Sequence, residues 1–473
     1  MSAAPRRMPG PISAALPPIV SAAGLLLAVI APWIFGDVAP AWQAGGLALA
    51  MLVLVATAAA PEAYAAILFF AGAAILGVAP PDTVFSGFHS GAFWLVLSGL
   101  VFGAAARHAG LADRLARQAA GVFGTSYAAL IAGLVAAGVL LAFLVPAAVG
   151  RVALLVPIAL ALAERAGYDA GHPGRTGLVM AAALGTFFPP FGILPANVPN
   201  MILTGAAETL YDHHFSYGGW LALHFPVLGI LKAVLLVVLL VRLFPAPPPR
   251  EAGAREAGAM APGVAADPRA LGRLALILGA TLALWATDWL HGLKPAWVGL
   301  SAAALILTPG LRLVPADFIR TGLPVGTLIF IAAMLSLGAV ISAAGLGDAM
   351  GGVMIDLAGF EPGADALNVY KLGLISTVVG LLGSLHGTPA IMTPLAARLA
   401  EATGLSLDTV LMTQALGFST ALLPYQSPPV IVALGLSGIG QGPAARAMIA
   451  LGLAAMLLLW PLDLVWWTVL GRI

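Results

Sequence analysis

Long apolar runs without charged residues constrain this chain more than any other feature. An α-helix of about 20 residues spans the roughly 30 Å hydrocarbon core of a bilayer. Charged residues make up only 9% of the 473 residues, whereas about 25% is usual in a soluble domain. We therefore expect an all-α integral membrane protein with about 11 transmembrane helices, at residues 14–36, 41–59, 62–79, 92–109, 174–206, 217–243, 270–289, 293–309, 325–344, 406–437 and 443–470.

Two further apolar runs, 122–165 and 368–402, are about twice too long for a single span. Each is interrupted near its middle, the first at FLVPAAVGR (143–151) and the second at GSLHGTPA (383–390). Each run forms either two crossings or a re-entrant hairpin that enters and leaves the membrane on the same side. We expect two re-entrant hairpins.

The positive charges indicate an orientation. Lys and Arg prefer cytoplasmic loops, and Arg6 and Arg7 make the start cytoplasmic. Eleven spans then leave the C-terminus outside, in an inner cell membrane, and counting each long run as two crossings does not change the sides. The inside loops hold Arg107, Arg114, Arg117, Arg165, Arg175, Arg242, Arg250, Arg255, Arg269, Arg273, Arg312 and Arg320, while the outside keeps few basic residues, among them Lys294, Lys371 and Arg398.

The chain contains an internal repeat. GAAARHAGLAD from Gly103 recurs as GAVISAAGLGD from Gly338, PAAVGRVALLVP (146–157) aligns with GSLHGTPAIMTP (383–394), and NVPNMI (197–202) aligns with SPPVIV (427–432). An odd number of predicted spans separates the copies, so the second copy is inverted, as in many secondary transporters. We expect N-terminal scaffold helices at 1–90, a first repeat at 91–245, a flexible cytoplasmic linker at 246–268, and a second repeat at 269–473.

Each half contains two expected helix breaks. One is the hairpin tip, within 122–165 or 368–402, and the other is ILPANVPN or LLPYQSPP within the broken helices 174–206 and 406–437. Irregular backbone at membrane depth is tolerated where it is buried in protein or lines a cavity. Half-helices that begin at such breaks direct the positive ends of their dipoles at the cavity. Four breaks therefore favour an anion site.

This pattern resembles the divalent anion/sodium symporter (DASS) family of the ion transporter superfamily. The resemblance rests on a hairpin tip followed by an apolar LLVPIALALAE (154–164) and then by a broken helix with Pro-Pro-Asn character, in both halves. It implies symport of a small anion, such as a dicarboxylate or sulfate, by alternating access in a homodimer. In this family Ser-Asn-Thr stands at each tip and Thr-Pro-Pro-Asn at each broken helix.

The sequence departs from those motifs. Ala147, Ala148 and Val149 replace the first tip motif, and Ser384, Leu385 and His386 replace the second. A hard cation prefers oxygen ligands, so the first sodium site is absent or weak, and a weak one remains near Ser384 and Gln426. The substrate-binding residues that the resemblance and the tips together predict are Arg151, Val149, His386, Thr388, Asn197, Asn200, Ser384, Ser427, Pro199, Pro428 and Pro429.

Two of these residues carry the predicted chemistry. Arg151 lies near the first tip, and an intramembrane Arg is a candidate counter-charge for carboxylate, sulfate or sulfonate. His386 occupies the Thr position of the second tip and, with an ordinary pKa near about 6.5, is able to bind a proton that couples transport. The alternative readings are that Arg151 snorkels or caps a helix end and that His386 is a hydrogen-bonded packing residue.

Other function classes find less support. No HExxH or GxSxG motif is present, so we expect no enzyme. The net charge of +1 favours no nucleic-acid partner, and no cofactor is expected beyond a sodium ion or a proton as the coupling ion. A sodium-coupled dicarboxylate symporter remains an alternative. So does a cation/proton antiporter of the same superfamily, which needs buried acids, whereas Asp113, Glu164, Asp348 and Glu401 lie near predicted span ends.

Overall fold

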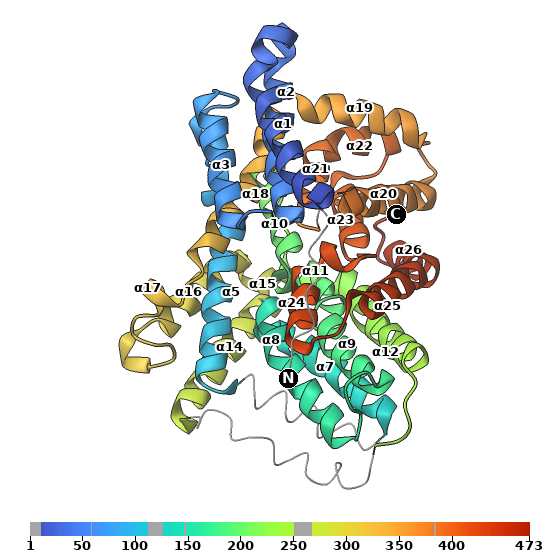
Figure 1. Ribbon diagram of the computed structural model, residues 1–473. Coiled ribbons are helices and arrows are strands. Elements are labelled where there is room, and N and C mark those ends of the chain that lie inside the picture. Colours follow the sequence, from blue (N-terminus) through green and yellow to red (C-terminus); the bar gives the residue numbers. More distant parts are fainter. Residues whose placement is uncertain (1–10, 58, 112–125, 146–147, 250–266, 383–384) are drawn as a thin grey trace.

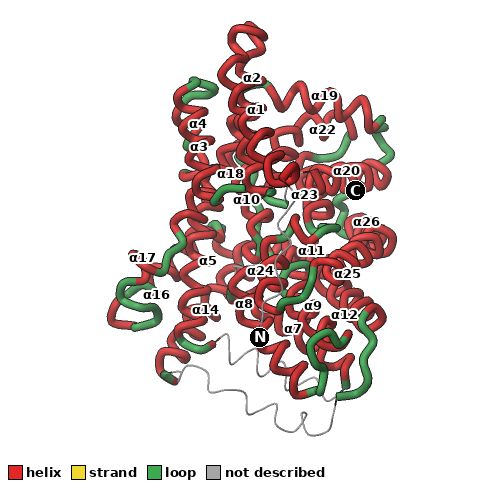
Figure 2. The backbone as a smooth tube through the Cα atoms, in the orientation of Figure 1, coloured by secondary structure: helices red, strands yellow, loops and turns green. Residues whose placement is uncertain are grey.

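The computed structural model describes residues 11–57, 59–111, 126–145, 148–249, 267–382 and 385–473, which form helices and loops without any strand (Figures 1 and 2). In this part of the chain seven helical stretches are long and apolar enough to cross a membrane: Pro18–Ala56, Gly91–His108, Tyr127–Leu144, Tyr217–Leu243, Pro268–Ala286, Val325–Ala343 and Gln441–Val469. The predicted all-α membrane fold is therefore confirmed.

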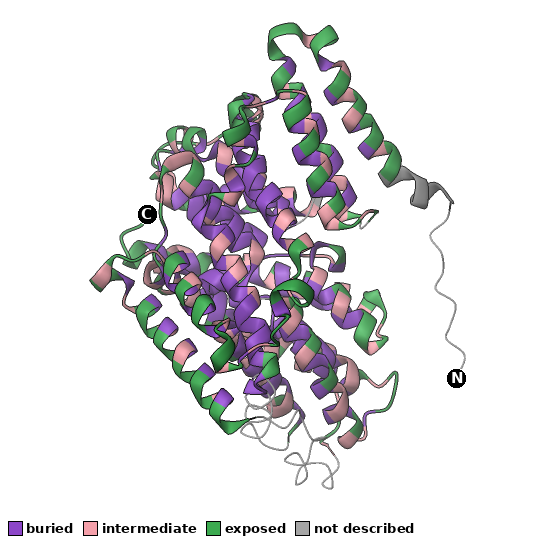
Figure 3. Cartoon of the chain, turned by 90° about the vertical axis from the view of Figure 1, so that its left-hand side faces the viewer, coloured by how far each residue is buried: buried purple, intermediate pink, exposed green. Residues whose placement is uncertain are grey.

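The N-terminal helices form a layer on one side of the molecule. Helix α1 (Pro11–Phe35) packs along α2 (Ala39–Ala56), and α2 packs on α3 (Glu62–Ile75), which α4 (Pro81–Val84) follows. Gly36, at φ 54°, supplies the left-handed conformation that ends α1 and lets the chain turn back. Figure 3 shows that outward faces of α1 and α2 are exposed. Exposed apolar side chains such as Trp33 on this surface suit contact with lipid tails.

The first half of the chain contains a helix pair, a broken helix and a long crossing helix. The expected hairpin at 122–165 corresponds to two helices that flank residues 145–147, although its tip residues 146–147 lie outside the described part. The expected broken helix at 174–206 is interrupted by two short 3₁₀ turns, Pro189–Gly192 and Leu194–Ala196. The helices are α5 (Gly91–His108), α7 (Tyr127–Leu144), α8 (Ala148–Arg165), α9 (Pro173–Gly185), α10 (Val198–Tyr211), α11 (Tyr217–His224) and α12 (Lys232–Leu243).

The second half repeats this order from α18 onward, after the four described helices α14 to α17. The 3₁₀ turn Pro424–Gln426 interrupts the broken helix, and tip residue Ser384 lies outside the described residues. Helix α19 is not among the predicted spans. The helices are α14 (Pro268–Ala286), α15 (Asp288–His291), α16 (Pro295–Ile306), α17 (Phe318–Thr321), α18 (Val325–Ala343), α19 (Leu346–Ala358), α20 (Asp365–Leu382), α21 (Gly387–Met392), α22 (Ala396–Thr403), α23 (Leu407–Phe418), α24 (Pro428–Ser437), α25 (Gln441–Ala454) and α26 (Trp460–Val469).

Small residues allow the helix pairs to cross closely in both halves. A Cβ on Gly138 of α7 would lie 2.8 Å from the backbone of Gly185 in α9. In the second half, a Cβ on Gly417 of α23 would lie 2.3 Å from Cβ and 2.8 Å from the carbonyl carbon of Ser376 in α20. Close backbone approach at small residues is a common way for helices to associate in a membrane. These contacts fix each helix pair against the broken helix of its own half.

The predicted linker at 246–268 falls largely outside the described residues, which exclude 250–266. The first residues of the linker follow α12. Its last residue, Pro268, already begins α14, and the side chain of Asp267 caps that helix.

Candidate functional site

A cavity of about 530 Å³ lies where the two halves of the chain meet. Helix α8 of the first half packs on α24 of the second, and α10 of the first half packs on α21 of the second. The cavity is lined from both halves by Glu62, Val96, Gly99, Leu100, Gly103, Arg107, Ala148, Val149, Gly150, Ala153, Phe187, Pro195, Asn197, Val198, Pro199, Met201, Gly322, Pro324, Thr327, Phe330, Ile331, His386, Pro428 and Pro429. A pocket between helix ends of two repeats is a typical ligand site of a transporter.

About half of the predicted binding residues line this cavity, namely Val149, Asn197, Pro199, His386, Pro428 and Pro429. The remaining described ones, Arg151, Thr388, Asn200 and Ser427, are buried around it but do not form its wall, and Ser384 lies outside the described residues. The lining residues come from both hairpins and both broken helices, the four places where the sequence predicts helix breaks.

Arg151 lies behind the cavity wall, in a cage of oxygen atoms. Its side chain is 1% exposed. Nη1 donates to the carbonyl oxygens of Val145 at 2.6 Å and Ala196 at 3.1 Å. Nη2 donates to the carbonyl oxygen of Thr186 at 2.7 Å and to Oδ1 of Asn197 at 3.4 Å, and Nε donates to Thr186 at 3.2 Å. These five bonds engage the five N–H groups of a guanidinium.

The cage joins the two helix breaks of the first half. Val145 is the last residue before the hairpin tip, while Thr186, Ala196 and Asn197 belong to the interruption of the broken helix. Carbonyl groups at such breaks have no partner within a helix, and lipid offers none. The buried cation therefore satisfies backbone oxygens that the breaks leave free, with no N–H group remaining for a substrate.

Two asparagines stabilise the same break. Asn197 donates from Nδ2 to the carbonyl of Phe187 at 3.1 Å while its other face meets the cavity. Asn200 donates from Nδ2 to Phe191 at 3.1 Å and to Ile193 at 3.0 Å, and its Oδ1 has no hydrogen-bond partner in the structure. Asn197 thus connects the guanidinium of Arg151 to the cavity wall.

In the second half an amide side chain closes the break. Oε1 of Gln426 accepts hydrogen bonds from the backbone N–H groups of Leu422 at 2.9 Å and Leu423 at 2.8 Å, and Nε2 donates to Gly380 at 2.9 Å. Ser427 caps α24 by accepting from the N–H of Val430 at 3.4 Å. The oxygen of Gln426 that would bind sodium is therefore engaged with backbone donors.

His386 borders the cavity just before α21. Its ring meets the ring of Phe330 edge to face, with 5.9 Å between the centroids, and it has no hydrogen bond to any described residue. Within the described structure the imidazole nitrogens have no partner, and the ring borders the cavity. This arrangement differs from the hydrogen-bonded packing role that was the alternative for this residue.

The sequence does not identify two charged residues of the wall, Arg107 and Glu62. Arg107 lies in the last turn of α5 and is exposed, and it forms no ion pair with the described residues. In sequence it reads as a cytoplasmic topology signal. The internal repeat distinguishes Arg107 from its counterpart. The equivalent position in the second copy, four residues after Gly338, is Ser342, so this positive charge is present in one half only.

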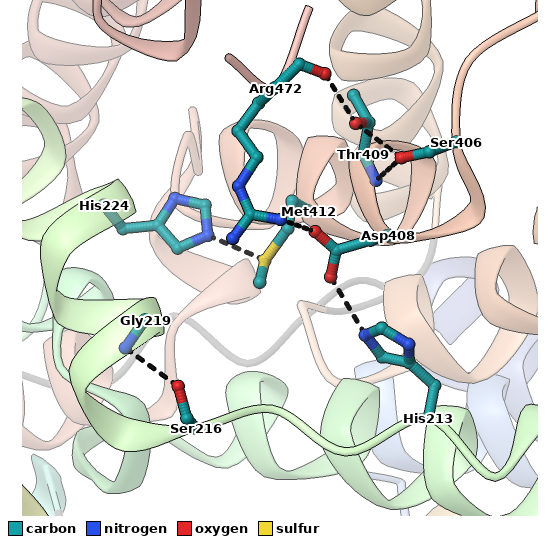
Figure 4. A network of polar contacts seen from close by, with 9 residues as sticks. All are labelled: His213, Ser216, Gly219, His224, Ser406, Asp408, Thr409, Met412 and Arg472. Carbon is teal, nitrogen blue, oxygen red and sulfur yellow. Dashed lines mark hydrogen bonds and ion pairs between the residues drawn. The ribbon is translucent and has the colours of Figure 1, made fainter. Parts of the chain in front are cut away.

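A second polar cluster lies away from the cavity, near the C-terminus (Figure 4). Asp408, in the first turn of α23, accepts from His213 Nε2 at 2.9 Å and is paired with Arg472. On the other side, Nε2 of His224 lies 3.2 Å from the sulfur of Met412. No group of three or more His, Asp or Glu suited to a metal ion occurs in the part of the chain that the structure describes.

Comparisons with known proteins bear on the family and the fold of this chain. A family model described as the sodium:sulfate symporter transmembrane region matches residues 20–473. A protein of Cupriavidus necator described as a membrane protein is 28% identical over 441 residues, which are 87% of this chain and 85% of that protein. The crystal structure of the Alcanivorax borkumensis YdaH transporter, reported to have an unusual topology, matches with a TM-score of 0.55 and 19% identity, over 82% of this chain and 88% of that one.

Proposed function

Because the chain belongs to the sodium:sulfate symporter family, as the match over residues 20–473 shows, we propose that this secondary transporter carries a small organic or inorganic anion of the dicarboxylate, sulfate or sulfonate type. Transport proceeds by alternating access, in which the hairpin-bearing parts move against the N-terminal helices and α16. The proposed binding site is the cavity between the two halves.

The observation that carries the anion assignment is the arginine on the cavity wall, Arg107, which forms no ion pair in the described structure with Glu62, the one carboxylate of that wall. Arg107 has no ion-pair partner among the described residues, and His386 has no hydrogen bond to them, yet both line the same cavity. A guanidinium binds carboxylate or sulfate through two parallel hydrogen bonds. Arg107 therefore supplies the counter-charge that the sequence assigned to Arg151, and Arg151 supports the wall from behind through Asn197.

We propose a proton as the coupling ion. Two observations support independence from sodium: Arg151 already occupies the oxygen cage of the first break, and the oxygen of Gln426 is engaged at the second. Protonation of His386 adds a positive charge to the cavity wall, so the anion binds more tightly as the pH falls. Thr388 and Ser427 then act as supporting residues near the site.

The alternatives keep some support. The family description names sodium and so favours sodium coupling, as in the alternative of a sodium-coupled dicarboxylate symporter. A cation/proton antiporter needs a buried acid, and the cavity wall contains one carboxylate, Glu62. We further propose a homodimer in the inner membrane, with the N-terminus in the cytoplasm and the C-terminus outside. These features rest on the family resemblance and the distribution of Arg and Lys.

The test is uptake of a panel of labelled anions by the purified protein in liposomes, with sodium and proton gradients imposed separately. We expect proton-driven uptake of one anion class without sodium, loss of uptake in Arg107→Ala, and partial recovery in Arg107→Lys. Arg273→Ala is the matched control, since Arg273 is exposed in the second turn of α14 and does not line the cavity. Strict sodium dependence would overturn the proposed coupling, and full activity of Arg107→Ala would overturn the proposed site.

A further inference from the structure

Two long helices, one from each half, contain a π-helical segment near their middle. In the first half it spans Phe225–Leu231, between α11 and α12, and in the second half Ala455–Leu459, between α25 and α26. The two segments pack together in a small apolar cluster of Val227 with Ala455 and Leu459. Such segments are rare and frequently mark functional sites.

A buried charged residue follows each π segment. Lys232 is the first residue of α12, and Asp463 lies in the first turn of α26; both are fully buried. Asp463 lies within the predicted span 443–470. It is not one of the four acidic residues that the sequence offers for a cation/proton antiporter. A buried acid and a buried amine in a membrane protein are costly and are a functional-site hypothesis by default.

The two residues differ in how well they are satisfied. Nζ of Lys232 donates to the carbonyl oxygen of Ser419 at 2.9 Å and to its hydroxyl at 3.0 Å. Both carboxyl oxygens of Asp463 are buried and have no hydrogen-bond partner among the residues that the structure describes. Lys232 and Asp463 form no ion pair in the described part of the chain, although the π segments that precede them pack together. A carboxylate in this setting is stabilised by taking up a proton.

Two other side chains of α26, and one that packs against that helix, also carry polar atoms that have no partner among the described residues. The indole N–H groups of Trp460 and Trp467 and Nδ1 of His224 are also buried without partners. Among the described groups that face α26, His224 of α11 approaches the sulfur of Met412, and Tyr370 of α20 donates to Met456 at 3.1 Å. The network of Figure 4 leads from partly exposed Asp408 toward His224, whose ring lies 6.0 Å from that of Trp467.

Lys232 connects this acid to the anion cavity. Ser419 ends α23 at the start of the second helix break, and the same break leads through Gln426 to Pro428 and Pro429 in the cavity wall. The arrangement repeats that of the first half, where Arg151 holds the carbonyl of Thr186 at the end of α9. In both halves a buried cation therefore holds the helix end at the break.

We propose that the coupling proton is carried on Asp463, that protonation of His386 adjusts only the affinity of the cavity for the anion, and that Lys232 transmits the charge of Asp463 to the second helix break. While Asp463 is ionised, the two charges offset each other. When it binds a proton, the charge of Lys232 loses its partner and the buried region becomes net positive, which favours an anion in the cavity. Proton and anion are then bound together, as symport requires. This inference rests on the proposed anion transport.

The test compares two transport modes in liposomes. Asp463→Asn mimics the protonated acid, so we expect exchange of labelled for unlabelled anion to continue, while accumulation driven by a proton gradient falls about tenfold or more. Asp356→Asn is the matched control, because Asp356 is exposed on α19 and does not line the cavity. Asp463→Glu keeps the titrating group, and we expect it to retain coupling with a shifted pH profile.

The outcomes separate this inference from the proposed function. Gradient-driven accumulation that persists in Asp463→Asn overturns the proton site, and so does an equal fall of both modes in both Asp463 variants, because a structural role would affect both. Sodium-for-proton exchange without any anion, dependent on Asp463, would reassign the acid to antiport. Absence of anion transport in either mode of the wild type would instead refute the proposed function.

Discussion

Removing the guanidinium of Arg151 tests the oxygen cage directly. In Arg151→Ala the buried carbonyl groups of Val145, Thr186 and Ala196 lose their hydrogen bonds to that side chain. Each unsatisfied buried group costs about 1–3 kcal/mol, so the gross loss is about 3–9 kcal/mol. Removal of the buried charge relieves its desolvation, which offsets part of this loss, so we expect a net loss toward the lower end of the range, about 3 kcal/mol. That is a large share of a typical free energy of unfolding of about 5–15 kcal/mol.

The assay is thermal unfolding of the purified protein in detergent, in choline chloride and in sodium chloride. We expect Arg151→Ala to unfold at a lower temperature than wild type in choline, and sodium to restore part of the difference. The restoration is expected because the vacated oxygens, including Oδ1 of Asn197, are the ligand type that a hard cation prefers. Wild type should show no such sodium effect.

Two results would refute this reasoning. If Arg151→Ala matched wild type in choline, the cage would contribute nothing to stability. If sodium stabilised wild type and variant equally, the cage would have no special affinity for a cation. Arg273→Ala, which removes an exposed arginine from α14, controls for the general loss of a positive charge.

The other predictions concern the cavity and the helix crossings. His386→Gln should transport at high pH but lose the tightening of anion binding as the pH falls, measured as KM across pH; an unchanged pH profile would exclude the proton role. Arg107→Ala should raise KM for the anion at least about tenfold, as expected for a lost charge-assisted bond of about 1.5–3 kcal/mol. Gly138→Ala and Gly417→Ala should each lower stability by about 1–3 kcal/mol because the new methyl group meets backbone or Cβ atoms. Gly435→Ala, where nothing lies within 4 Å of the added Cβ, should leave the unfolding temperature almost unchanged.

The fold follows from sequence because its main determinants are local. Apolar length predicts the spans, and Pro-rich interruptions predict the breaks: the 3₁₀ turns Pro189–Gly192 and Pro424–Gln426 lie within the predicted broken helices. Helix α19 was missed because it is short and its apolar side chains are interspersed with Gly and Asp. The division of the chain into domains and the re-entry of the hairpins stay predictions.

The site is harder to predict, because it depends on which distant groups meet. Position within the tip and broken-helix motifs predicts Val149, Asn197 and His386 as binding residues, and all three line the cavity. The partners of Arg151 lie up to 46 residues away, and no local pattern states which carbonyl a break will leave free. In sequence, Arg107 looks like a topology signal, because an arginine at the end of a span also fits the preference of basic residues for cytoplasmic loops.

A cation that is part of the chain cannot dissociate, and this has a consequence for how voltage acts on transport. A bound sodium ion crosses with the substrate and is left behind, whereas Arg151 returns with the empty carrier in every cycle. Its charge is then displaced forward in one half of the cycle and backward in the other, with no net transfer. Moving one elementary charge through 100 mV costs about 2.3 kcal/mol. If Arg151 moves across the field, the membrane potential will therefore retard one half-reaction as much as it assists the other, and the turnover rate, but not the equilibrium gradient of the anion, will depend on this residue.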